Sequence, residues 1–139
     1  MKSRYEPLVK LKKQSLDKAE QQLMNANTEV TLSDTCLRNA YAELSTFESP
    51  LNGPIGELLQ AQMILQAQHR EIETCRLRVE RAGRNQYAAR EAFRLSRIEF
   101  EKFNYLELLE VEAMMAKVKQ EEAKMLDEIG TMTYKKEWI

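Results

Sequence analysis

The side chains best able to do chemistry are two cysteines and one histidine, namely Cys36, Cys75 and His69. Their separations do not match the short Cys and His spacings of a zinc site, and three such groups leave a metal short of ligands. No glycine-rich phosphate-binding loop and no nucleophile with a partner base stands out. We therefore expect no catalytic residues, no metal and no cofactor, and we predict that the protein is not an enzyme.

The composition indicates that long helices carry these side chains. Of 139 residues, 31% are charged and 7% are aromatic, with four glycines and three prolines, which is typical of helical rods rather than sheets. The net charge of −1 provides no basic field for nucleic acid. No apolar run approaches the roughly 20 residues that span a bilayer, and no secretory signal follows the basic start. We expect a protein of the reducing cytosol that neither binds nucleic acid nor inserts into a membrane.

One segment breaks the helical pattern. Residues 48–56 hold two prolines and two glycines, which a helix does not tolerate. Pro7 is acceptable in the first turn of a helix, where its missing N–H has no partner to lose. The prediction is a single coiled-coil domain over residues 1–139, with helix 1 at about 5–47, a loop at 48–56 and helix 2 at about 57–135.

Each predicted helix carries a heptad repeat, which indicates a coiled coil. In helix 1 one apolar row is spaced by seven and a second row follows three residues later: Val9, Leu16, Leu23, Val30, Leu37 and Leu44, then Lys12, Ala19, Ala26, Ser33, Ala40 and Phe47. Helix 2 repeats the arrangement: Leu58, Leu65, Ile72, Val79, Gln86, Phe93 and Phe100, then Ala61, Gln68, Cys75, Ala82, Ala89, Ser96 and Phe103. The fold class is therefore all-α, a two-helix antiparallel coiled-coil hairpin with a long C-terminal overhang of helix 2.

The register follows if Phe47 faces Leu58 across the loop. Nearly every layer then joins a large side chain to a small or flexible one, which keeps the layer volume even. Examples are Ala40 with Leu65, Ser33 with Ile72, Val30 with Cys75, and Ala19 with Gln86.

Two further expectations depend on this register. Cys36 lies off the seam and out of line with Cys75, so we expect no disulfide and interpret Cys75 as a small core residue. The arginine run Arg76–Arg97 faces an acidic strip of helix 1 between Asp17 and Glu48, so interhelical ion pairs are favoured over the alternative of an RNA-binding surface.

In the same register Tyr5 faces Phe100, and roughly 35 residues of helix 2, about 50 Å, continue without a partner. An apolar stripe runs along this overhang, and an eleven-residue step from Phe100 to Val111 turns it relative to the seam. An isolated helix of this kind is marginally stable in water, so another protein, or a second copy of the chain, should cover the stripe. The stripe comprises Leu108, Val111, Met115, Val118, Met125, Ile129 and Met132.

The chain resembles the FliJ family of the flagellar type III export apparatus. The start YEPLVKLKK, residues 5–13, is similar to the family's aromatic, apolar and basic opening, and the end LDEIGTMTYKK, residues 126–136, is similar to its C-terminal segment. The turn into a longer second helix also resembles the family's hairpin, which is similar in shape to the central stalk of rotary ATPases.

The resemblance implies a non-catalytic stalk and regulator that inserts into the hexameric export ATPase and links it to the export gate. It also implies a place in the cytoplasm at the membrane-facing base of the flagellum, and export chaperones as further partners. Expected ATPase-ring contacts are Lys10, Lys12, Lys13, Val111, Met115, Val118, Met125, Ile129, Met132 and Tyr134. Expected gate contacts are Tyr41 and His69, although His69 is also typical of an ordinary boundary residue.

Three alternatives stay open from the sequence. The chain could be a homo-oligomeric coiled-coil scaffold whose overhangs pack on each other, or an export chaperone. A stalk subunit of a rotary proton-pumping ATPase is less favoured, because such stalks usually carry a further globular or longer part.

Overall fold

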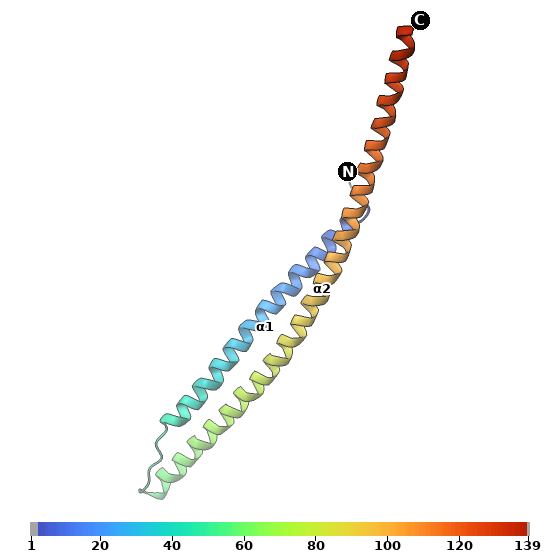
Figure 1. The fold of residues 1–139 in the computed structure, drawn as a ribbon. Helices are drawn as coiled ribbons and strands as arrows, with labels where there is room; N and C mark the ends of the chain where they lie inside the picture. Colours follow the sequence, from blue (N-terminus) through green and yellow to red (C-terminus); the bar gives the residue numbers. More distant parts are fainter. Residues whose placement is uncertain (1–2, 139) are drawn as a thin grey trace. The chain divides into compact units, whose positions relative to one another are not determined.

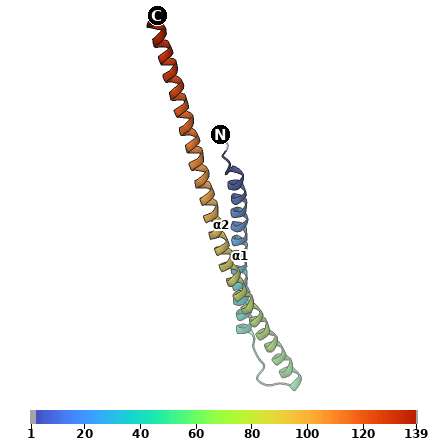
Figure 2. The same ribbon diagram turned by 90° about the vertical axis from the view of Figure 1, so that its right-hand side faces the viewer.

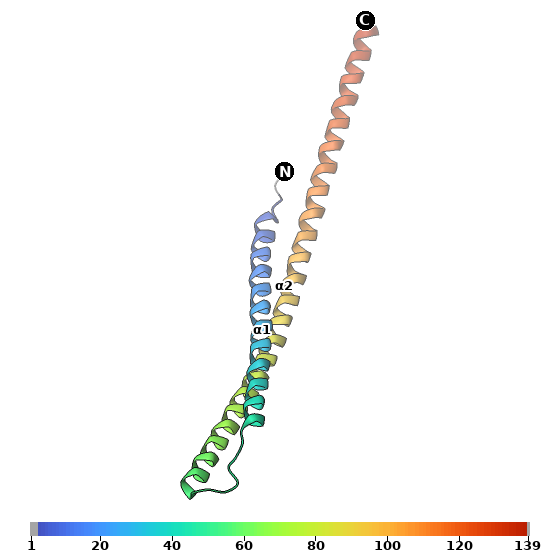
Figure 3. The ribbon, with the colours of Figure 1, turned by 90° about the vertical axis from the view of Figure 1, so that its left-hand side faces the viewer.

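The computed structural model describes residues 3–138, and these form two α-helices and no strand. Helix α1 spans Glu6–Thr46 and helix α2 spans Ile55–Trp138, joined by a linker of residues 47–54 (Figure 1). The two helices run side by side in opposite directions (Figures 2 and 3). The predicted all-α helical hairpin is confirmed.

Polar groups at both helix starts explain where the helices begin. The Ser3 hydroxyl accepts a hydrogen bond from the Tyr5 N–H at 3.1 Å, and the Ser3 carbonyl accepts one from the Glu6 N–H at 3.1 Å. At the start of α2, the Pro54 carbonyl accepts the N–H groups of Glu57 and Leu58 at 3.0 and 3.3 Å. A proline serves there because this position supplies only a carbonyl to the first turn.

The described chain divides into two compact units, and each helix contributes to both. We call residues 17–95 the hairpin unit, and residues 3–16 with 96–138 the terminal unit. Within residues 3–138, neither helix contains a stretch long and apolar enough to cross a membrane.

The predicted heptad positions form the core of the hairpin unit. Every one of these positions on α1 between Ala19 and Leu44 is buried or half-buried. On α2 the same holds from Ala61 to Phe93, whereas Leu58 is exposed. The most deeply buried are Ser33, Ala82, Ala40 and Cys75. Small side chains at these positions let the two backbones approach closely.

The predicted register of the hairpin unit is wrong by one heptad. Ala40 packs in a core cluster with Ile72 and Cys75, seven or more residues beyond its expected partner Leu65. Gln86 donates a hydrogen bond to Asn27 at 2.8 Å, although it was expected opposite Ala19.

The path of the linker explains this shift. The linker runs alongside the first turns of α2 rather than forming a tight turn, so α2 begins beyond the end of α1 (Figures 1 and 3). Helix α1 therefore pairs with residues farther along α2. Leu58 is exposed because α1 does not extend opposite it, as it would after a tight turn. A shift by seven residues also keeps every seam position on the seam, so the heptad pattern allows both registers.

The terminal unit shows the same shift through its own contacts. Lys13, rather than Tyr5, lies over the Phe100 ring, with its Nζ 5.6 Å from the ring centroid. The Ser3 hydroxyl donates to a Glu110 carboxylate oxygen at 2.9 Å, and Arg4 Nε lies 3.5 Å from the same oxygen. The N-terminal segment therefore covers α2 as far as Glu110. The overhang is correspondingly shorter than predicted, about 28 residues or 40 Å at 1.5 Å per residue.

Candidate functional site

The overhang surface, residues 111–135, presents apolar side chains to solvent. Every residue from Met115 to Lys135 is exposed. Six of the predicted contact residues lie in this stretch and are 37–69% exposed: Met115, Val118, Met125, Ile129, Met132 and Tyr134. Val111 is half-buried beside Glu110, the residue that binds Ser3 and Arg4. From Val111 onward the predicted stripe thus lies on the part of α2 beyond the last contact of the N-terminal segment, Glu110, which is the part of α2 that runs to the C-terminal end in Figure 2.

Shallow grooves separate the apolar residues of the overhang surface. Met115, Val118 and Glu122 line one, and Glu122, Met125, Leu126 and Ile129 line the next. Leu126 is 69% exposed and was not among the predicted contacts, because it lies beside the strict heptad row rather than on it. Exposed apolar strips of this kind mark protein interaction sites.

The three predicted basic contacts have different environments in the terminal unit. Lys10 forms an exposed ion pair with Glu6 of the preceding turn at 3.5 Å. The Lys12 side chain is 32% exposed, with its Nζ 3.6 Å from Glu99 and 5.5 Å from the centre of the Phe103 ring. Lys12 therefore closes the end of the aromatic seam, which is a structural task.

Tyr41 and His69, the predicted gate contacts, are exposed residues of the hairpin unit. Each follows a seam residue directly, Ala40 on α1 and Gln68 on α2. They thus lie at the edge of the seam, where a partner protein can reach them.

Sequence reasoning missed a second apolar face near the linker. Ile55, Leu59 and Met63 follow one another at intervals of four on α2 and are 75%, 55% and 70% exposed, and Leu51 in the linker is 95% exposed. Leu59 and Met63 are exposed because they lie off the seam positions of α2, among which the neighbouring Ala61 is buried. The four-residue spacing was visible in the sequence, but the heptad pattern directs attention only to the seam positions of this segment.

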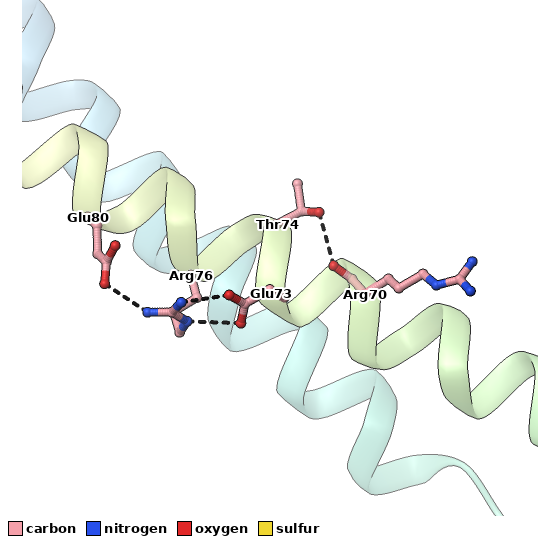
Figure 4. A network of polar contacts seen from close by, with 5 residues as sticks. All are labelled: Arg70, Glu73, Thr74, Arg76 and Glu80. Carbon is pink, nitrogen blue, oxygen red and sulfur yellow. Dashed lines mark hydrogen bonds and ion pairs between the residues drawn. The ribbon is translucent and has the colours of Figure 1, made fainter.

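The arginines of α2 pair within their own helix more than was predicted. Arg76 donates to Glu73 at 2.6 and 3.0 Å and to Glu80 at 2.8 Å, all on one face of α2 (Figure 4). Arg94 likewise donates to Glu91 at 2.9 Å. Neighbours three or four residues away are always within reach on a helix, so they compete well against residues of α1.

Arg78 bridges the two helices as predicted. Its Nε and Nη2 donate to both carboxylate oxygens of Glu29 at 2.6 and 3.1 Å. This bidentate pair, chiefly through its hydrogen bonds, lowers the pKa of Glu29 below its ordinary value.

The two cysteines lie together, contrary to the prediction from register. Cys75 is 3% exposed, and the half-buried Cys36 packs against its core cluster. Hydrogen bonding to Cys36, together with burial, raises the pKa of the Cys75 thiol to about 11. Both are free thiols. Among the described residues, no three His, Cys, Asp or Glu side chains are grouped so as to hold a metal ion.

A family model described as "Flagellar FliJ protein" matches residues 1–137. No curated protein and no solved structure matches the chain.

Proposed function

Because the chain belongs to the FliJ family of flagellar export proteins, we propose that it is a non-catalytic stalk and regulator of the flagellar export ATPase. The overhang inserts into the ATPase ring, and the hairpin unit contacts the cytoplasmic domain of the export gate. The protein would then work in the cytoplasm at the flagellar base. The observation that carries this proposal is the run of uncovered apolar side chains from Met115 to Tyr134.

The energetics support a partner for the overhang surface. Burial of one leucine or methionine side chain contributes about 1.5–3 kcal/mol, so covering this stripe yields ample binding free energy. A single helix of about 28 residues is marginal in water, and enclosure by a ring would stabilise it. Methionines suit this role because their flexible side chains repack against non-identical surfaces.

The mechanism follows from a mismatch of symmetry. One rod inside a six-subunit ring cannot make the same contacts with every subunit. Unequal contacts would favour different nucleotide states around the ring and so couple ring assembly to hydrolysis. The overhang supplies most of these contacts, and Lys10 supplies a basic contact. Lys12 and Lys13 instead lie over phenylalanine rings of the seam.

The test measures ATP hydrolysis by the export ATPase of the same genome. The variant Met115→Gln/Met125→Gln/Met132→Gln keeps side-chain length and helix propensity but removes apolar surface. It should weaken ATPase binding by more than about a hundredfold, since each methionine contributes more than 1 kcal/mol. A matched variant, Ala113→Gln/Lys124→Gln/Thr131→Gln, places three glutamines on the opposite face and should activate normally. Equal behaviour of the two variants would overturn the proposal.

The gate contact needs a separate binding assay. Tyr41→Ala and His69→Ala should weaken binding to the gate's cytoplasmic domain and leave ATPase activation unchanged. Tyr87→Ala is the control, because Tyr87 is also an exposed tyrosine of the hairpin unit, at 69%. Loss of gate binding by Tyr87→Ala alone would move the contact away from Tyr41.

The alternative of a homo-oligomeric scaffold predicts a different result from sedimentation. Two overhangs packed on each other would give a stable dimer at micromolar concentration, and the methionine variant would be monomeric. A chain that is monomeric alone and binds the ATPase favours the stalk. A chaperone role predicts binding to export substrates that the methionine variant loses without any effect on hydrolysis.

A further inference from the structure

Two free thiols from different helices meet in the core of the hairpin unit. Cys75 of α2 is 3% exposed and shares a cluster with Ala40 and Ile72. Cys36 of α1 packs against this cluster and is only half-buried, so small molecules can reach it. Interaction with Cys36, together with burial, raises the pKa of the Cys75 thiol, so this thiol is protonated at neutral pH.

The two cysteines differ in access. Cys36 is half-buried, whereas Cys75 is 3% exposed, so a dissolved oxidant reaches the Cys36 sulfur first. The thiolate is the nucleophilic form of a cysteine, and access decides which of the two meets the oxidant. Cys36 is therefore placed to attack, and its neighbour Cys75 is placed to resolve the product.

We propose that Cys36 and Cys75 are a peroxide-sensitive pair that closes into a disulfide between α1 and α2. The Cys36 thiolate attacks one oxygen of hydrogen peroxide, the O–O bond breaks, and protonation of the leaving hydroxide gives water and Cys36 sulfenic acid. The Cys75 sulfur then attacks the Cys36 sulfur, the S–O bond breaks, and the hydroxyl leaves as water with the Cys75 proton. Two thiols and one peroxide thus become one disulfide and two waters.

The disulfide would tie the two helices of the hairpin unit together at mid-seam. Closing a loop of this length constrains the unfolded chain and raises Tm by about 10 °C. In a reducing compartment such a bond is transient and serves as a redox sensor. Oxidation of the pair by peroxide would therefore make the hairpin unit more stable against unfolding.

The first experiment treats the full-length chain with hydrogen peroxide, blocks remaining thiols and maps tryptic peptides without reduction. Cleavage after Lys18, Arg38, Arg70 and Arg76 places the cysteines in peptides 19–38 and 71–76. The expected product is these two peptides joined, in monomeric protein, and dithiothreitol should separate them. A cross-link between two chains, or separate overoxidation of each cysteine, would overturn the proposal.

Variants then test the division of roles. In Cys75→Ser, Cys36 should form a sulfenic acid that dimedone traps, whereas in Cys36→Ser the remaining Cys75 should react far more slowly. Equal rates of reaction with peroxide for the two cysteine variants would refute these roles.

Discussion

Replacing Ile72 with alanine removes the largest side chain from the central cluster of the hairpin unit. Ile72 is 9% exposed and packs with Ala40 and Cys75. Such truncations cost about 2–5 kcal/mol, and a two-helix seam can partly collapse, so we expect about 2–3 kcal/mol. Thermal unfolding followed by circular dichroism should show Tm falling by about 5–10 °C.

A second substitution makes this experiment specific to the register. Ala40→Leu should recover about half of the lost stability in the Ile72→Ala background, because the new side chain enters the vacated space. The same Ala40→Leu should not rescue Leu65→Ala, because Leu65 lies outside the Ala40 cluster. Urea unfolding of the two double variants beside the singles provides the comparison. Rescue of Leu65→Ala and not of Ile72→Ala would show that the hairpin pairs one heptad earlier.

Three further predictions concern single residues. Arg78 lowers the pKa of Glu29 from 4.5, so their pair stabilises the fold above that pH and the contribution is lost as pH falls through the depressed value. Glu29→Gln should therefore narrow the difference in urea stability between pH 7 and pH 3. Lys12→Ala should cost about 1 kcal/mol, because Lys12 contacts Glu99 and an aromatic ring. Gly83→Ala should stabilise the chain by about 1 kcal/mol in the same assay, since an added Cβ meets open space on α2.

Matched variants give each of these predictions a control. Glu121→Gln changes an exposed overhang carboxylate and should leave the pH difference intact. Lys10→Ala breaks an exposed pair within α1 and should cost much less than Lys12→Ala. If Gly83→Ala is neutral or destabilising, the helix must need a glycine there for a reason other than local packing.

The seam was predictable because the heptad period of the sequence identifies the buried positions. Apolar and small residues every three and four positions identify the buried face without any knowledge of the partner, and Ala19, Ser33 and Ala82 are buried as expected. The register was not predictable on the same basis. Ala40 has a large partner whether it meets Leu65 or Ile72, so complementarity of volume cannot separate registers that differ by seven.

The contacts that distinguish the registers involve long polar side chains. Arg78 reaches Glu29 and Ser3 reaches Glu110, but a pattern of charges does not reveal which of several neighbours an arginine or glutamate will choose. Local pairs such as Arg76 with Glu73 compete for the same groups. The sequence analysis missed the proximity of Cys36 and Cys75 because these residues come together only in the shifted register.

The overhang was predictable as an apolar stripe, and its length was not. Period identified Met115 to Met132, which the structure leaves exposed. The position where cover ends depends on the last contact of the N-terminal segment, Ser3 with Glu110, and thus on the register again. The pattern of one chain does not identify a partner for this surface, because a partner's surface leaves no period in this sequence.

The bond between Ser3 and Glu110 joins residues 107 positions apart, and this separation matters while the ribosome makes the chain. The first helix is complete early but has no second helix to pack against until the linker and the start of α2 have emerged. Pairing must then proceed from the linker outward, and the residues made first find their partners last. Until Glu110 leaves the ribosome, Ser3 and Arg4 lack this partner, so the segment around them stays without this contact while α2 is made.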